Sequence, residues 1–165
     1  SVVYSVDDKF TTKFMTLLSR LPIMPLYYNG NTKFNPIHVI DLVDIIFHII
    51  VNEKKSLILE CIGPETITFK NIIKKLLYSI QKKRVLLPLP FHVASLTAKF
   101  LQLLPNPLLT EDQLRLLKYD NVRTGLYKTN LDIGLKISRN FDDEIIKYSY
   151  NWRTGGQFAE NNIKK

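Results

Sequence analysis

The run of residues 104–122 constrains the fold of this 165-residue chain more than any other stretch. Pro105 and Pro107 end the apolar segment before them, because proline has no N–H to donate and its ring collides with the preceding helical turn. Thr110 then stands three residues before Gln113, which is the spacing of a capping box, with two acidic residues between them. The run therefore predicts one helix over 91–104 and a second over 111–119.

Apolar residues recur at helical spacing in further segments. In the clearest of them, residues 69–82, they fall on one stripe, and Thr68 is placed to cap the helix. The segment 42–52 is apolar on almost every side, so we expect a buried helix with Asp41 as its N-cap. Two more helices are predicted at 7–20 and 142–152.

Short apolar runs predict the strands. The continuous run 56–62 suits the interior of a parallel sheet. Asn29 and Gly30 separate two further runs, 26–28 and 33–35, and this dipeptide is a strong hairpin signal. The remaining strands are predicted at 1–4 and 85–87. Strands at 1–4 and 56–62, with apolar helices between and after them, indicate an α/β fold.

The composition bounds the class of protein. A hydrophobic content of 45% and a charged content of 23% are ordinary for a globular protein. No stretch reaches the roughly 18 uncharged apolar residues that span a bilayer. The single cysteine, Cys61, excludes a disulfide within the chain and favours a reducing compartment. We expect one domain over 1–153, followed by a loose tail over 154–165.

The net charge of +8 is concentrated in one part of the chain. The clustered basic residues are Lys54, Lys55, Lys70, Lys74, Lys75, Lys82, Lys83 and Arg84. They predict either a surface for an anionic membrane or an acidic partner, or an ordinary solvated helix face. Nucleic acid is not expected as a partner, because aromatic residues do not interleave with these charges.

Several motifs together carry a family resemblance. They are the run 104–122, residues 1–4 with Asp7, Asp8 and Phe10 after them, residues 32–43 with the pattern Val-x-Asp, Gly63-Pro64-Glu65, residues 87–91, and Trp152-Arg153 with residues 156–158. With these motifs the chain resembles the C-terminal half of the NAD(P)-binding accessory subunit of respiratory complex I and its bacterial relatives. Those proteins are atypical extended short-chain dehydrogenase/reductases, similar to NAD-dependent epimerases and dehydratases.

The resemblance implies the C-terminal part of a doubly wound NAD(P)-binding fold and a mainly helical substrate-side lobe. The glycine-rich dinucleotide half is absent, because none of the six glycines forms G-x-G-x-x-G, and no Tyr-x-x-x-Lys pair stands in a fitting place. We therefore expect a fragment of a longer protein that binds NAD or NADP, while this chain alone binds neither. The expected partners are the missing half, complex I subunits or an anionic membrane surface, with self-association of the fragment.

The resemblance also assigns candidate site residues. Ser1, Val2 and Val3 would line the nicotinamide side of the cofactor cleft. Phe10, Phe14, Phe34 and Asn35 would face the substrate side. Arg123 is a candidate for binding an anionic group, because its guanidinium suits phosphate or carboxylate. No catalytic residue and no metal site is predicted, since the three histidines and the cysteine have no ligand spacing.

The sequence leaves three functions open. The first is an accessory-subunit-like protein in which the nucleotide has a structural or regulatory role, so whether the parent protein is an enzyme stays open. The second is the substrate lobe of a sugar-nucleotide epimerase or reductase. The third is a membrane-surface or protein-docking module. The resemblance implies a location in the cytoplasm or at the cytoplasmic side of the inner membrane.

Overall fold

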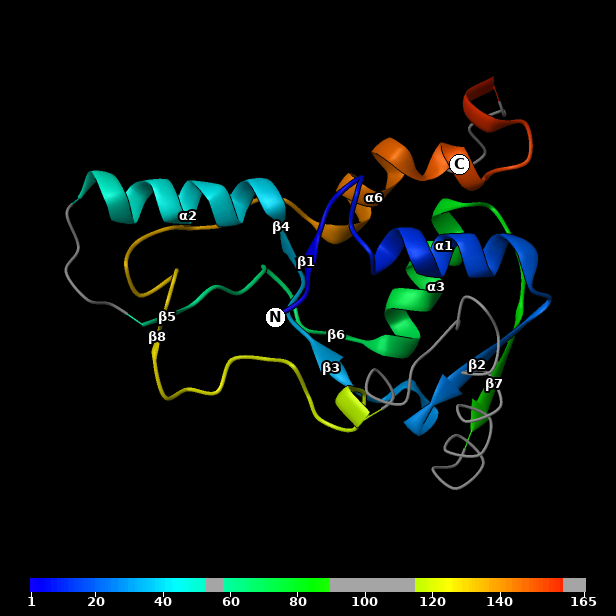
Figure 1. The fold of residues 1–165 in the computed structure, drawn as a ribbon, viewed down its shortest axis with the longest axis horizontal. Helices are drawn as coiled ribbons and strands as arrows, with labels where there is room; N and C mark the ends of the chain where they lie inside the picture. Colours follow the sequence, from blue (N-terminus) through cyan, green and yellow to red (C-terminus); the bar gives the residue numbers. More distant parts are fainter. Residues whose placement is uncertain (53–57, 90–114, 159–165) are drawn as a thin grey trace.

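The computed structural model describes residues 1–52, 58–89 and 115–158, and Figure 1 shows their arrangement. The α-helices are α1 (Thr11–Arg20), α2 (Val39–Val51), α3 (Phe69–Ser79) and α6 (Phe141–Tyr148). Three short 3-10 helices are η1 (Tyr28–Gly30), η2 (Ser149–Trp152) and η3 (Gly156–Phe158). The strands are β1 (Val3–Tyr4), β2 (Ile23–Tyr27), β3 (Lys33–Phe34), β4 (Ile37–His38), β5 (Leu59–Glu60), β6 (Ile67–Thr68), β7 (Val85–Leu89) and β8 (Lys128–Thr129).

The strands form pairs among the described residues. β1 pairs with β4, β2 with β7, and β5 with β8, all in parallel, while β3 and β6 are antiparallel. Parallel pairs joined through helices confirm the predicted α/β class. Of the strand expected over 56–62, residues 58–62 are described, and within them the strand is β5, which is half-buried rather than interior to a sheet.

The core lies where α1, α3 and α6 pack together. The apolar stripe predicted for residues 69–82 is confirmed, because all its members are buried: Phe69, Ile72, Ile73, Leu76, Leu77 and Ile80. Thr68 caps α3 as predicted, with its Oγ1 accepting the N–H of Asn71 at 3.3 Å. The helix ends at Ser79, soon before Gln81 with its positive φ of 55°.

The predicted hairpin over residues 26–35 is wrong. Its two strands diverge, since β2 pairs with β7 and β3 pairs with β6. Between them Tyr28, Asn29 and Gly30 all have positive φ, and they form η1 rather than a two-residue turn. Asn-Gly supplies the left-handed conformation that a hairpin needs, but here it redirects the chain toward a different partner strand.

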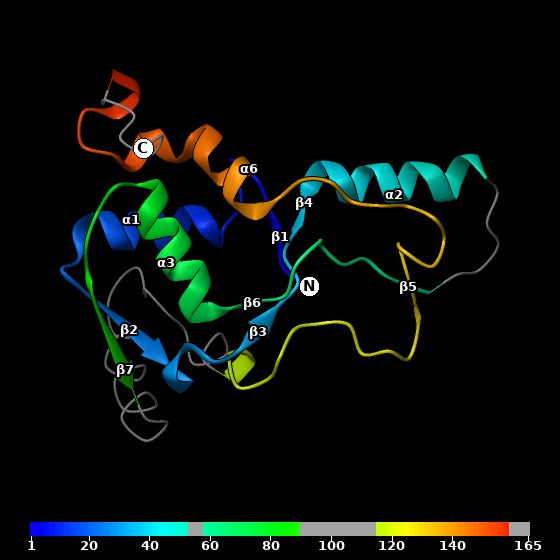
Figure 2. The same cartoon turned by 180° about the vertical axis from the view of Figure 1, so that it is seen from behind.

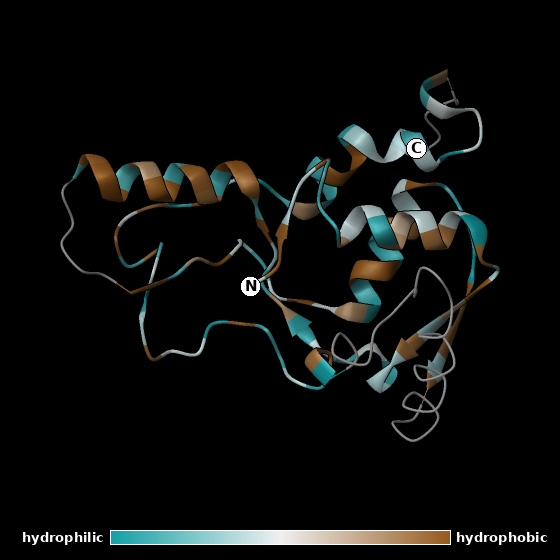
Figure 3. Cartoon of the chain, viewed as in Figure 1, coloured by the Kyte–Doolittle hydropathy of each residue, from teal (hydrophilic) through white to brown (hydrophobic). Residues whose placement is uncertain are grey.

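The helix predicted over 42–52 is present as α2, but its predicted N-cap and its predicted burial are both wrong. Helix α2 begins at Val39, and its N-cap is His38, whose Nδ1 accepts the N–H of Ile40 at 3.3 Å. Asp41 lies inside the first turn. Ile45 is the buried apolar residue of this helix, whereas its exposed ones are Ile40, Val43, Ile46, Phe47, Ile50 and Val51. Figure 3 shows this helix as an almost continuous hydrophobic rod that extends away from the core.

Other predictions fall at the edges of the described structure. The helix expected over 91–104 and the capping box of Thr110 and Gln113 lie outside the described residues. The helix expected over 142–152 divides into α6 and η2, and the tail expected from residue 154 contains η3. No helix in the described part of the chain is long and apolar enough to cross a membrane.

Candidate functional site

The candidate site is a cavity of about 370 Å³ beside the start of α1 and β3. Four residues singled out from the sequence line it: Val2, Phe10, Phe14 and Phe34. The other lining residues are Lys9, Lys13, Leu116, Leu117, Tyr119, Asp120 and Asn121. We call it the phenylalanine cavity. Its size falls within the range of small-molecule sites, about 300–1,000 Å³.

The phenylalanines form a packed aromatic wall. The ring centroids of Phe10 and Phe14 are 5.1 Å apart at 77°, and those of Phe10 and Phe34 are 5.9 Å apart at 52°. Phe14 also meets Phe69 of α3 edge-to-face at 5.2 Å. Phe14 and Phe34 are buried, whereas Phe10 is half-buried. The wall therefore belongs to the core and to the cavity at once, with Phe10 the most accessible ring.

The polar rim is held by backbone contacts across distant segments. Asp120 Oδ1 accepts the N–H of Lys33 at 2.8 Å. The carbonyl oxygen of Asn121 accepts from the hydroxyl of Ser1 at 2.6 Å and from the N–H of Asn35 at 3.3 Å. The described lining thus combines an apolar wall with a few charged groups, and it offers no paired acid and base for proton transfer.

The other candidates lie elsewhere. Ser1 and Val3 line a second cavity of about 390 Å³ next to β5, together with Arg123. Asn35 and Arg123 line a third cavity, of about 680 Å³. The Asn35 amide donates to Glu65 O at 3.2 Å and to Thr66 Oγ1 at 2.9 Å. The structure thus brings Val2 and the three phenylalanines together and separates them from the other candidates.

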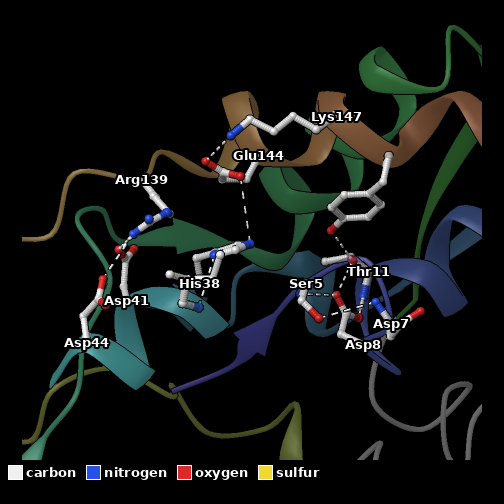
Figure 4. Close-up of polar contacts among 12 residues, drawn as sticks. Ser5, Asp7, Asp8, Thr11, His38, Asp41, Asp44, Arg139, Glu144 and Lys147 are labelled. Atoms are coloured by element: carbon white, nitrogen blue, oxygen red, sulfur yellow. Dashed lines mark hydrogen bonds and ion pairs between the residues drawn. The ribbon is translucent and has the colours of Figure 1, made fainter. Parts of the chain in front are cut away.

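A polar network that the sequence analysis missed joins α2 to α6, as Figure 4 shows. Arg139 pairs with Asp41, and its Nη1 lies 3.6 Å from Asp44 Oδ2. His38 Nε2 lies 3.9 Å from Glu144 Oε2, and Glu144 Oε1 accepts from Lys147 at 2.7 Å. These residues are about a hundred positions apart in sequence, so no local pattern signals the network.

The protonation state of His38 follows from its contacts. Its Nδ1 accepts a backbone N–H, so that nitrogen carries no proton and the ring is neutral. Burial lowers the pKa of His38, and the nearby carboxylate of Glu144 opposes this effect. The ring also packs edge-on against Tyr4 at 5.2 Å. His38 therefore acts as a buried cap of helix α2.

Three other chemistries lack support among the described residues. Tyr78 and Lys82 have the Tyr-x-x-x-Lys spacing, but neither lines the phenylalanine cavity, and Lys82 Nζ donates to Ser19 O at 3.2 Å. Burial raises the pKa of the Cys61 thiol, which disfavours a nucleophilic thiolate. Within the described ranges, no group of His, Cys, Asp or Glu could hold a metal ion.

The basic cluster near α3 is partly engaged in structural contacts. Lys75 pairs with Asp142 and lies 3.7 Å from Glu65. The guanidinium of Arg84 donates to Leu18 O at 2.8 Å and to Ser19 O at 3.2 Å. Several of these charges thus hold α1, α3 and α6 together rather than forming a continuous free surface.

The chain is similar in fold to a solved protein structure. No model of a known protein family matches the chain, and no curated protein matches it. Among solved structures it is similar to MlghC, a GDP-mannoheptose C4 reductase from Campylobacter jejuni with NADP bound. The two are 15% identical with a TM-score of 0.55, over 92% of this chain and 46% of that chain. The chain thus spans about half the length of that reductase and shares the fold of part of it.

Proposed function

We propose that this chain is the substrate-side lobe of an NAD(P)-binding protein with an extended short-chain reductase fold. The observation that carries the proposal is the phenylalanine cavity, where Val2 next to β1 meets Phe10, Phe14 and Phe34. Ligands of open α/β folds bind beside the carboxyl ends of strands, and Phe10 lies in the segment that follows β1. The fold shared with part of an NADP-bound reductase supports the same assignment.

The partner in this proposal is a dinucleotide-binding half. The outer face of α2 supports it, because Phe47 and Ile50 are 67% and 68% exposed and no described element covers them. Large exposed apolar patches usually mark an interface. A parallel sheet covered by helices is the architecture that buries such a helix.

Within this fold, we favour a protein similar to the complex I accessory subunit, with NAD or NADP in a structural or regulatory role. The apolar character of the phenylalanine cavity supports this preference. A sugar substrate would need hydrogen-bond partners for its hydroxyl groups. The described wall of the cavity is formed mainly by apolar side chains, which cannot form hydrogen bonds. In this role the protein would act at the cytoplasmic side of the inner membrane, beside other complex I subunits.

Calorimetric titration with NADPH tests the proposal. The chain of 165 residues should show no saturable binding, because it carries no glycine-rich phosphate loop. A longer product of the same gene that includes such a loop should bind, and Phe10→Ala in it should change ligand contacts without unfolding it. Micromolar binding of NADPH to this chain alone would contradict the assignment.

The second candidate is a sugar-nucleotide reductase, and the fold shared with MlghC, a GDP-mannoheptose C4 reductase, is the observation that favours it. Oxidation of NADPH in the presence of a GDP-linked keto sugar discriminates the two candidates. Turnover by the longer protein would favour the reductase. Tight NADPH binding without turnover would favour the structural role.

A further inference from the structure

The third cavity, of about 680 Å³, lies on the opposite side of β3 from the phenylalanine cavity. Successive residues of a strand face opposite sides, and here Lys33 and Asn35 line the third cavity while Phe34 lines the other. The segment after residue 120, yellow in Figure 1, runs from β3 to β8 and supplies further lining residues, among them Arg123.

Three basic side chains surround this cavity: Lys33, Arg123 and Lys136. None of them forms an ion pair with the described residues. One carboxylate, that of Asp120, also lines the cavity, and its Oδ1 accepts the backbone N–H of Lys33 at 2.8 Å. Asp132 nearby accepts from Thr129 N and Oγ1 at 2.7 and 2.8 Å. With three basic side chains against one acidic side chain in its lining, the cavity carries an excess of positive charge.

The floor beneath these charges is buried and fixed. Asn130 is fully buried, and its Oδ1 accepts the N–H of Ile62 at 2.9 Å. Asn35 is buried and holds the loop at Glu65 through its amide. A Cβ on Gly63 would lie 1.7 Å from the carbonyl oxygen of Pro36, so backbone there packs directly on backbone. The cavity is thus shaped before any ligand arrives, which lowers the entropic cost of binding.

We propose that this cavity binds a small phosphorylated molecule of the diphosphate class. The Arg123 guanidinium suits bidentate contact with phosphate oxygens, while Lys33 and Lys136 act as point charges. The apolar lining residues Ile62, Val122 and Ile137 give room for the uncharged part of such a ligand. The inference does not rest on the proposed nucleotide role, because none of these residues lines the phenylalanine cavity.

Calorimetric titration of the 165-residue chain with inorganic pyrophosphate tests the inference. One molecule should bind per chain. Arg123→Gln and Lys136→Gln should each weaken binding about tenfold, as expected when a hydrogen bond to a charged group is lost. Lys74→Gln is the matched control, since it removes one exposed charge from α3, and it should leave the affinity unchanged. The interaction should weaken as salt shortens the Debye length.

Three results would overturn the inference. The first is that the wild-type chain shows no saturable binding of pyrophosphate, while equal unfolding temperatures show that the wild type and all variants are folded. The second is an equal loss in Lys74→Gln and Arg123→Gln, which would indicate unspecific attraction by net charge. The third is Arg123-dependent binding to vesicles containing phosphatidic acid with no binding of free pyrophosphate, which would assign the site to a lipid headgroup. NADPH binding does not enter this test, so its outcome is separate from that of the proposed function.

Discussion

Helices α2 and α3 have similar lengths and opposite surroundings. In α3 the apolar residues occupy one stripe that packs into the core, and exposed Lys74 lies on the other side. In α2 apolar residues surround the helix, yet Ile45 is its buried apolar residue. The periodic spacing of apolar residues thus predicts which face of α3 packs against the rest of this chain. The uniform apolarity of α2 indicates only that this helix needs a neighbour to pack against. In the described structure, most of its apolar side chains are exposed.

The two helices are also held differently. Helix α3 is stabilised along its length by side-chain packing. Helix α2 is held at its base, where His38 caps it and Arg139 pairs with Asp41. We therefore expect substitutions along α3 to lower stability strongly, and substitutions along α2 to matter mainly in its first turn.

The largest expected effect is that of Leu76→Ala in α3. Leu76 is fully buried, so the substitution removes apolar contacts and leaves a cavity, which should cost about 3 kcal/mol of unfolding free energy. The matched substitution in α2, Ile50→Ala, should cost less than about 0.5 kcal/mol because Ile50 is exposed. Urea denaturation followed by circular dichroism measures both. Equal losses would show that α2 is covered in solution.

Next in size is the effect of Arg139→Gln at the base of α2. Asp41 is buried, and without Arg139 its carboxylate would lose its ion-pair partner. We expect a loss of about 2 kcal/mol, less than for a fully buried pair because the Arg139 side chain is partly exposed. Arg139→Lys, which keeps the charge, should lose less. Thermal unfolding at low and high salt gives the comparison, and two variants as stable as the wild type would contradict the anchoring role.

A smaller, pH-dependent effect is expected from His38. Its pKa is lowered in the folded state by burial, so the unfolded chain binds the proton more readily. The contribution of His38 to stability is complete above the unfolded value of 6.5 and is lost as the pH falls through the folded pKa. In His38→Asn, which keeps a capping side chain, the decline of stability with acidification should be shallower. His48→Asn on the same helix is the control, and an identical change in both variants would refute the assignment.

The smallest effect on stability is expected on the outer face of α2. The double variant Phe47→Gln and Ile50→Gln should change the free energy of unfolding by no more than about 0.5 kcal/mol per site. It should reduce self-association in sedimentation velocity, because these side chains belong to an exposed apolar patch. Tyr78→Gln, an exposed aromatic on α3, is the control. A wild-type chain that stays monomeric at high concentration would remove the basis of this prediction.

Local signals in the sequence predicted helix α3 well. The stripe of α3 and its Thr68 cap needed only spacing and side-chain chemistry over a few turns. The cap of α2 was misassigned because Asp41 is a better N-cap residue type than His38. The Asp41 carboxylate pairs with Arg139, which lies 98 residues away in the sequence. This ion pair stabilises Asp41 at a position inside the helix rather than at the N-cap. The hairpin was misassigned similarly, because pairing with β6 and β7 outweighed the turn signal.

For the site, too, some features could be predicted from the sequence and others depended on tertiary packing. The sequence indicated Phe10, Phe14 and Phe34 as candidates through a family resemblance, and Arg123 through its anion chemistry. The sequence by itself determined the class of fold, the face of α3 and the need of α2 for cover, since these depend on periodicity and apolar content. Only the tertiary structure decided which candidates share a cavity, and that Lys33 and Lys136 join Arg123. The physical reason is that a cavity is formed by segments far apart in the chain, and short-range patterns carry no information about their packing.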